Sequence, residues 1–209
     1  MQPNITKEEF ANSLNVSRES IEKLEIYLKL LVKWQKAINL VSGKTLPDAW
    51  NRHFVDSAQL LPLIPNHVKT IADIGSGAGF PGVVIAILRP DIDVHLIESD
   101  EKKCQFMRTV SRETGVKFEV HSKRIESAHD VVRPDMVSAR ALASLEDLFG
   151  YVYPWAEQNK DLTMLFLKGE RATEEIAQAE DKYSFKTEIF SSDTDADANI
   201  LRIANLCIK

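Results

Sequence analysis

A glycine-rich segment between an apolar strand and an apolar helix places the strongest constraint on how this chain can fold. Residues 71–82 are Ile-Ala-Asp-Ile-Gly-Ser-Gly-Ala-Gly-Phe-Pro-Gly, and an apolar run follows them. Gly75, Gly77 and Gly79 give the backbone angles that are closed to other residues and let a ligand approach closely. Pro81 favours a first helical position, and the free amides at a helix N-terminus favour anionic or hydrogen-bond-accepting groups. The segment therefore predicts a site for a nucleotide-type ligand.

The glycine spacing distinguishes between nucleotide ligands. In the dinucleotide fingerprint G-x-G-x-x-G the third glycine would fall at position 80, which is Phe80. The observed G-x-G-x-G, with Asp73 two residues before the first glycine, resembles motif I of S-adenosylmethionine (SAM)-dependent methyltransferases. In those enzymes the turn wraps the methionine half of SAM, and the carboxylate holds its ammonium directly or through water. A tight turn without a ligand is the alternative interpretation.

A second carboxylate supports an adenosine ligand. The apolar strand 93–97 ends at Glu98, 19 residues after Gly79. An acidic residue at this point can accept hydrogen bonds from ribose hydroxyls. SAM and NAD share the ribose, so Glu98 indicates adenosine without choosing between them. The alternative is an ordinary exposed loop carboxylate.

The alternation of strands and helices from residue 70 onward predicts an α/β fold. We expect a Rossmann-like SAM-dependent methyltransferase fold with a mostly parallel seven-stranded sheet flanked by helices. Residues 1–66 are predicted to form a helical N-terminal extension, and residues 67–209 the methyltransferase domain, as one structural unit. The expected strands are 70–74, 93–97, 116–121, 135–139, 163–167, 185–190 and 200–207, and the expected helices are 82–89, 101–114, 144–157 and about 170–182.

The N-terminal extension carries polar residues of interest. A long amphipathic helix, with Val32 on its predicted apolar face, ends at a break over residues 39–43. A second helix is expected from about Pro47, and it places His53 and Asp56 three residues apart.

Charge alone does not indicate a nucleic-acid partner, because the net charge is −5. Residues 1–100 carry 10 basic and 12 acidic side chains, residues 101–140 carry 9 and 6, and residues 141–209 carry 7 and 13. The small central surplus is compatible with a phosphate-facing edge.

Composition and cysteine usage favour the cytoplasm. The chain has no apolar run of membrane-spanning length and does not begin like a signal peptide. Cys104 and Cys207 fit no metal or disulfide spacing, and both lie in apolar periodic segments, which predicts buried free thiols in a reducing compartment. We expect no metal and no membrane partner.

Further candidate residues follow the predicted strands, where parallel sheets bind ligands. Ile125 and Glu126 follow strand three, where such folds contact adenine, although an exposed turn is equally compatible. Arg140 follows strand four and is poorly explained by core packing. Lys168 follows strand five, and the same argument applies to it less strongly.

The absence of two known motifs restricts which atom of a substrate this chain could methylate. Residues 138–142 are Ser-Ala-Arg-Ala-Leu, where enzymes that methylate exocyclic amines of adenine usually carry Asn/Asp-Pro-Pro-aromatic. Neither cysteine lies where a cytosine C5 nucleophile is needed, and no obvious strong base follows a strand. These residues fit a target atom that needs only to be aligned with the methyl group. N7 of guanine is such an atom, because its lone pair is free.

Taken together, the motifs resemble a known family over nearly the whole chain. They are Asn39-Leu40 before a His53-containing helix, residues 73–82, Glu98-Ser-Asp-Glu-Lys-Lys, Ser138-Ala-Arg-Ala and Leu167-Lys-Gly. The chain resembles the bacterial small-subunit ribosomal RNA methyltransferase G family, also called glucose-inhibited division protein B. That family transfers a methyl group from SAM to N7 of one guanine in 16S rRNA.

The resemblance implies roles for individual residues. By position, SAM contacts would fall on Gly75, Phe80, Ile125, Glu126 and Arg140, alongside Asp73, Gly77 and Glu98 from the motif argument. Asn39, His53 and Lys168 would lie near the RNA, and Arg140, Lys168 and His53 are the candidate catalytic residues.

The predicted partner is the small ribosomal subunit or its assembly intermediate, and the predicted state is a monomer. Two other functions stay open. One is a SAM-dependent methyltransferase with a small-molecule or protein substrate, and the other is a non-catalytic nucleotide-binding module.

Overall fold

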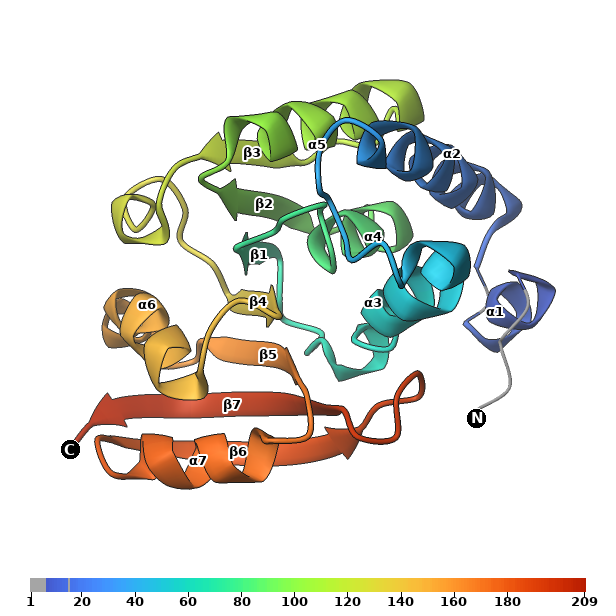
Figure 1. Cartoon of the computed structure of the whole chain (residues 1–209). Coiled ribbons are helices and arrows are strands. Elements are labelled where there is room, and N and C mark those ends of the chain that lie inside the picture. Colours follow the sequence, from blue (N-terminus) through green and yellow to red (C-terminus); the bar gives the residue numbers. More distant parts are fainter. Residues whose placement is uncertain (1–6, 15) are drawn as a thin grey trace.

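A single mixed sheet organises the chain (Figure 1). The computed structural model describes residues 7–14 and 16–209. The sheet has seven strands in the order β3-β2-β1-β4-β5-β7-β6; β1 to β5 are parallel, and β7 pairs antiparallel with both β5 and β6. The strands are β1 (Thr70–Ile74), β2 (Asp93–Glu98), β3 (Glu119–Ser122), β4 (Met136–Arg140), β5 (Thr163–Lys168), β6 (Tyr183–Ser191) and β7 (Asn199–Ile208).

Helices cover both faces of the sheet (Figure 1). The helices are α1 (Lys7–Ser13), α2 (Arg18–Gln35), α3 (Asp56–Ala58), α4 (Gly82–Leu88), α5 (Glu101–Thr114), α6 (Leu145–Gln158) and α7 (Ala172–Glu180). Helices α2, α4 and α5 lie on one side, and α6 and α7 lie on the other. Within β1, Ile71 faces the first group, whereas Ala72 and Ile74 face the second, as the period of two along a strand requires. The predicted fold class is confirmed.

The N-terminal helices share the core of the sheet. Ser17 caps α2 by accepting a hydrogen bond from the amide of Ser20 at 3.1 Å. Leu24, Tyr27 and Leu31 of α2 are fully buried against the α4 side of the sheet. The described N-terminal helices therefore share a hydrophobic core with the sheet, while the division at residues 66 and 67 stays a prediction. The placement of Val32 on the apolar face was wrong, because its side chain is 40% exposed.

The second predicted N-terminal helix is divided into three short pieces. A 3-10 helix (Leu46–Asp48) leads into a π-helix (Trp50–Val55), which continues as α3. π-turns within helices occur frequently at functional sites. Here the π-turn carries His53, whose ring is buried rather than exposed on a regular α-helix.

Two smaller predictions are also corrected. Pro81 is the N-cap of α4 and not its first helical residue, because the helix begins at Gly82. Cys104 is buried as predicted, but Cys207 is exposed, since it alternates with the inward-facing Leu206 along β7. Among the described residues, no helix has the length and apolar character needed to cross a lipid bilayer.

Candidate active site

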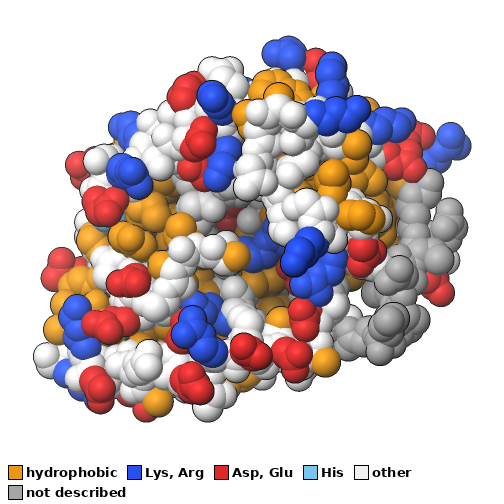
Figure 2. Space-filling model, viewed as in Figure 1, with side chains coloured by type: hydrophobic (Ala, Val, Ile, Leu, Met, Phe, Trp, Pro, Cys, Tyr) orange, Lys and Arg blue, Asp and Glu red, His pale blue; other side chains and the backbone are white. Residues whose placement is uncertain are grey.

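A cavity of about 710 Å³ opens at the carboxyl ends of the parallel strands. The face drawn in Figure 2 is hollowed near its centre, and basic and acidic side chains are interspersed around the hollow. The cavity wall is formed by the glycine-rich turn, the ends of β2, β4 and β5, and three other segments, which contribute residues from 40–59, 123–126 and 192–200.

The glycine-rich turn forms one wall of the cavity. Gly75, Gly77 and Gly79 have φ values of 62°, 58° and 95°, in the left-handed region that favours glycine. A Cβ atom built on Gly77 would meet only the Gly75 carbonyl oxygen, at 3.9 Å, so the space beside it is open. The backbone here forms a cradle that side chains would fill, as the prediction of a cofactor turn requires.

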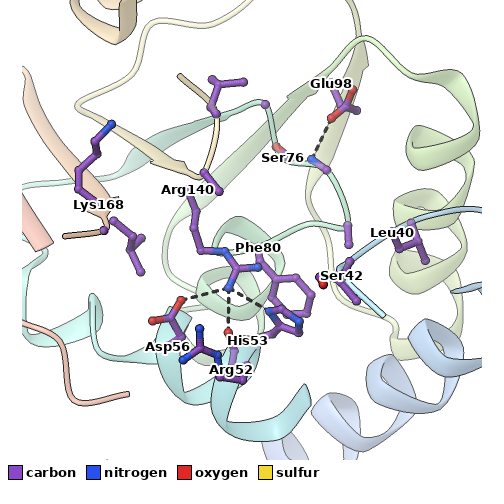
Figure 3. A pocket seen from close by; sticks show the side chains of 18 of the residues that line it. Leu40, Ser42, Arg52, His53, Asp56, Ser76, Phe80, Glu98, Arg140 and Lys168 are labelled. Carbon is purple, nitrogen blue, oxygen red and sulfur yellow. Dashed lines mark hydrogen bonds and ion pairs between the residues drawn. The ribbon is translucent and has the colours of Figure 1, made fainter. Parts of the chain in front are cut away.

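Glu98 lies at the base of this cradle (Figure 3). Its two carboxylate oxygens accept hydrogen bonds from the amides of Gly77 at 2.9 Å and Asp100 at 2.8 Å. These bonds fix the carboxylate at the end of β2 and on the cavity wall. Glu98 is therefore not a free loop carboxylate, and its position fits the predicted contact with a ribose.

Tyr27 supports the turn from the N-terminal region, a role that no sequence motif predicted. Its hydroxyl donates a hydrogen bond to the Ala78 carbonyl oxygen at 2.5 Å, 51 residues away in the chain. Its ring also stacks on Phe80, with centroids 5.1 Å apart. Helix α2 thereby holds the turn in place. On sequence alone, Tyr27 is indistinguishable from the other apolar residues of its helix face.

Asp73 lies beneath the turn and does not form part of the cavity wall. One carboxylate oxygen accepts a hydrogen bond from the Ser138 hydroxyl at 2.6 Å. The other is buried without a partner among the described residues, which is costly. Burial raises the pKa of Asp73 to about 6, against the opposing effect of the Ser138 hydrogen bond. The open cradle at Gly77 and the Glu98 carboxylate beside it fit SAM, whereas Asp73 is enclosed by the protein, and its contact with the SAM ammonium stays a prediction.

Arg140 is held by a cluster from the π-helix and α3 (Figure 3). Its Nη1 donates to the Arg52 carbonyl oxygen, to His53 Nδ1 and to Asp56 Oδ2, each at 3.1 Å. The guanidinium also lies over the Phe80 ring, 5.0 Å from its centroid. His53 and Asp56, which were expected three residues apart on one helix, thus both contact Arg140.

The contact with Arg140 determines the tautomer of His53. A guanidinium can only donate hydrogen bonds, so Nδ1 must accept and Nε2 must carry the proton. Nε2 lies 3.0 Å from the hydroxyl of Thr45, which in turn donates to the Ser42 carbonyl oxygen at 2.8 Å. Burial, followed by the charge of Arg140, lowers the pKa of His53 to about 3. The imidazole is therefore neutral at physiological pH.

The loop between β6 and β7 forms the opposite rim of the cavity and was not predicted as part of it. Thr194 donates a hydrogen bond to Asp56 at 2.8 Å, and Arg52 pairs with Asp195 at 3.0 Å. The sequence showed only a turn-rich acidic loop, and its contacts are with residues 138 and 143 positions away. The rim thus joins the C-terminal hairpin to the π-helix.

The remaining predicted residues differ in their access to the cavity. Ile125 and Glu126 lie on its wall, at the start of a 3-10 helix (Ile125–Ser127). Lys168 also reaches the wall, but its ammonium is engaged by Glu175 at 2.5 Å and by the Ala143 carbonyl oxygen at 2.8 Å. Asn39 is exposed and lies outside the cavity wall, one residue before the lining residue Leu40.

The fold and the cavity at the strand ends define a Rossmann-like methyltransferase. Solved structures agree on the fold. A mutant of MtNAS in complex with S-adenosylmethionine aligns with a TM-score of 0.57 at 12% identity, covering 96% of this chain and 84% of that one. A precorrin-6y methyltransferase from Geobacter metallireducens aligns with a TM-score of 0.54 at 13% identity, covering 80% and 91%.

The sequence comparison identifies the family. The family model for rRNA small subunit methyltransferase G (GidB) matches residues 20–200. Proteins named ribosomal RNA small subunit methyltransferase G are 45% identical in Parvibaculum lavamentivorans, over 97% of this chain and 90% of the relative, and 47% identical in Allorhizobium ampelinum, over 92% and 93%. The chain belongs to the rRNA small subunit methyltransferase G family. The predictions of this family, of a methyltransferase and of SAM as its cofactor are confirmed.

Replacing Glu98 by alanine should weaken SAM binding while the protein stays folded. The change removes a carboxylate acceptor and releases the Gly77 amide, which should lower affinity by roughly ten- to a hundredfold. Titration calorimetry with SAM measures this, and Glu101→Ala is the matched control, since Glu101 is a nearby exposed carboxylate outside the cavity wall. Unchanged affinity in a folded Glu98→Ala variant would remove Glu98 from the site.

Proposed function

We propose that this chain transfers the methyl group of SAM to N7 of a guanine in 16S rRNA. The observation that carries the proposal is the neutral, Arg140-bound His53, the one histidine among the described residues that line the cavity. Its Nδ1 is engaged and its pKa is about 3, so it is a poor proton acceptor at neutral pH. No described cysteine lines the cavity either. N7 of guanine needs neither a base nor a covalent nucleophile.

Different residues of the cavity would bind SAM and the target guanine. SAM supplies an electrophilic methyl on a sulfonium. Glu98 would hold the ribose, Ile125 and Glu126 the adenine, and the turn with Gly77 the methionine half. A methyl acceptor with a free lone pair, such as N7, would not require these residues to remove a proton. Alignment of the two reactants is then the main contribution of the protein.

Arg140 would fix the geometry of the target side. Its guanidinium stays charged at all relevant pH values and cannot act as a base. It joins the end of β4 to Phe80 and to the π-helix, so it sets the spacing between the cofactor turn and the N-terminal segment. We assign Arg140 and His53 to positioning, and we place Lys168 and Asn39 towards the RNA.

The cavity rim offers limited positive charge for an RNA. Lys103, Lys123 and Arg124 line the adenine side, and Arg52 and Lys168 line the opposite side. With a net charge of −5, the chain is unlike proteins that bind nucleic acid by charge alone. We therefore propose that it acts as a cytoplasmic monomer on a folded ribosomal substrate, the small subunit or its assembly intermediate, recognised largely by shape.

Transfer of labelled methyl groups from SAM tests this function. Purified protein is incubated with small subunits or rRNA from cells that lack it, and the methylated nucleotide is located by mass mapping. We expect a single 7-methylguanosine in 16S rRNA. Label appearing in protein or small molecules would instead support the alternative substrates, and binding of NADH without SAM would support a non-catalytic module.

The pH profile gives a second test of the chemistry. Because the pKa of His53 is lowered to about 3, its charge change lies far below neutrality. At saturating SAM and RNA, kcat should therefore be flat from about pH 7 to pH 8, above the pKa of about 6 of Asp73, with no ionisation of a catalytic base. His53→Gln should lower kcat without changing the shape of the profile. A single ionisation near pH 7 that disappears in His53→Gln would show a general base and contradict the choice of N7.

A further inference from the structure

Three potential metal ligands meet on the two strands at the β3 edge of the sheet. His95 lies on β2, and Glu119 and His121 lie on β3. The strand register places Glu119 directly beside His95, with His121 two residues further along the same face. None of the three lines the cavity of the proposed methyltransferase site. The cluster is therefore separate from the chemistry proposed above.

The atoms are spaced as metal ligands are. His95 Nδ1 lies 2.9 Å from His121 Nε2, and Glu119 Oε2 lies 3.5 Å from the first nitrogen and 3.7 Å from the second. A point equidistant from all three atoms is about 2.0 Å from each, and Zn–N and Zn–O bonds are about 2.0–2.2 Å long. The three donors can thus reach one cation with only small movements.

The surroundings also suit a cation. Both histidine side chains are 15% exposed, so their rings are held by the fold, while the Glu119 side chain is 69% exposed and leaves a path to solvent. Two imidazoles and a carboxylate form a ligand set typical of zinc, with a fourth position open to water. Such a set is too rich in nitrogen for Mg²⁺ or Ca²⁺, which prefer oxygen ligands.

We propose that His95, Glu119 and His121 bind a divalent transition-metal ion, with Zn²⁺ as the occupant. The metal joins the edge strand β3 to β2, with His95 three residues before Glu98 and His121 one residue before Ser122.

Without a metal, the two imidazole rings form a hydrogen bond with each other. They are nearly parallel, with an interplanar angle of 5° and centroids 5.2 Å apart, and one nitrogen donates to the other. A metal replaces the shared proton, and each ring turns slightly to aim its lone pair at the ion. The competing explanation is that this hydrogen bond alone fastens the edge strand, and the experiment must distinguish the two.

The test is a Zn²⁺ titration of the full chain, free of any affinity tag, followed by calorimetry at pH 7.5. We expect one site, and we expect His95→Gln and His121→Gln each to weaken it by roughly ten- to a hundredfold or more, since even supporting residues of metal sites have effects of that size. Glu119→Gln should weaken it too, and this exposed position carries little risk to folding. Absorbance of the Co²⁺-loaded protein reports the coordination geometry.

Matched variants exclude binding elsewhere. His67→Gln removes an exposed histidine outside the cluster, and Cys207→Ser removes the exposed thiol. Both should bind Zn²⁺ as the wild type does. Wild-type protein that takes up no Zn²⁺, or folded cluster variants that bind it with unchanged affinity, would overturn the proposal and leave the histidine pair as a hydrogen bond between strands.

Discussion

Gly77→Val is expected to abolish SAM binding. Gly77 has a φ of 58°, and a Cβ there projects into the open space of the cradle, where it meets only a carbonyl oxygen at 3.9 Å. A β-branched side chain would occupy that space and would also resist the left-handed conformation, at about 1–2 kcal/mol. Its strain would further disturb the amide that donates to Glu98. Calorimetry should detect no SAM binding at concentrations that saturate the wild type.

Gly115→Val is the control that separates the effect of filling the cradle from the effect of backbone strain. Gly115 ends α5 with a φ of 68°, and a Cβ there also meets nothing within 4 Å. The same substitution thus imposes the same kind of strain away from the cavity. It should lower the melting temperature, yet leave SAM affinity unchanged. If a folded Gly77→Val protein bound SAM as the Gly115→Val protein does, this turn could not be the cofactor loop.

The parts of the fold that follow from local pattern were predictable from the sequence. Buried parallel strands are recognisable as short apolar runs, so β1, β2, β4 and β5 lie close to their expected positions. The glycine-rich turn was also predictable, because positive φ values leave few choices of residue. The third strand was less so: it was expected over 116–121 but spans Glu119–Ser122, an edge strand with only part-buried side chains to mark it.

Contacts between distant segments were not predictable. Tyr27 reaches Ala78, Thr194 reaches Asp56, and no periodicity within either segment specifies its partner. His95 and His121 are likewise 26 residues apart and meet only through the strand register. The absence of a metal was predicted from the spacing of the cysteines, and that spacing carries no information about histidines on neighbouring strands. Burial and the contact with Arg140 also change the chemistry of His53 in a way that no local pattern indicates, while its predicted place near the RNA stays a prediction.

Arg140 is the residue through which most of these distant segments meet. It projects from the end of β4, and its partners come from the π-helix, α3 and the cofactor turn. Asp56, which pairs with it, also accepts the hydrogen bond from Thr194 on the opposite rim. The side chains of Arg140 and Asp56 are only 17% and 15% exposed, so this ion pair is shielded from solvent. Loss of the guanidinium would leave a carboxylate and a carbonyl group without their donor.

Arg140→Ala is expected to lower kcat/KM for methyl transfer by roughly a hundredfold, the effect of misplacing reactants by about 1 Å. Arg140→Lys should restore only part of this, because an ammonium keeps the charge but lacks the planar guanidinium that lies over the Phe80 ring. Arg202→Ala is the control, since Arg202 makes a two-pronged pair with Glu188 outside the cavity wall. Steady-state kinetics with SAM and RNA varied separately will show which reactant is misplaced. If Arg140→Lys recovered full activity, charge alone would account for Arg140, and the positioning role would be wrong.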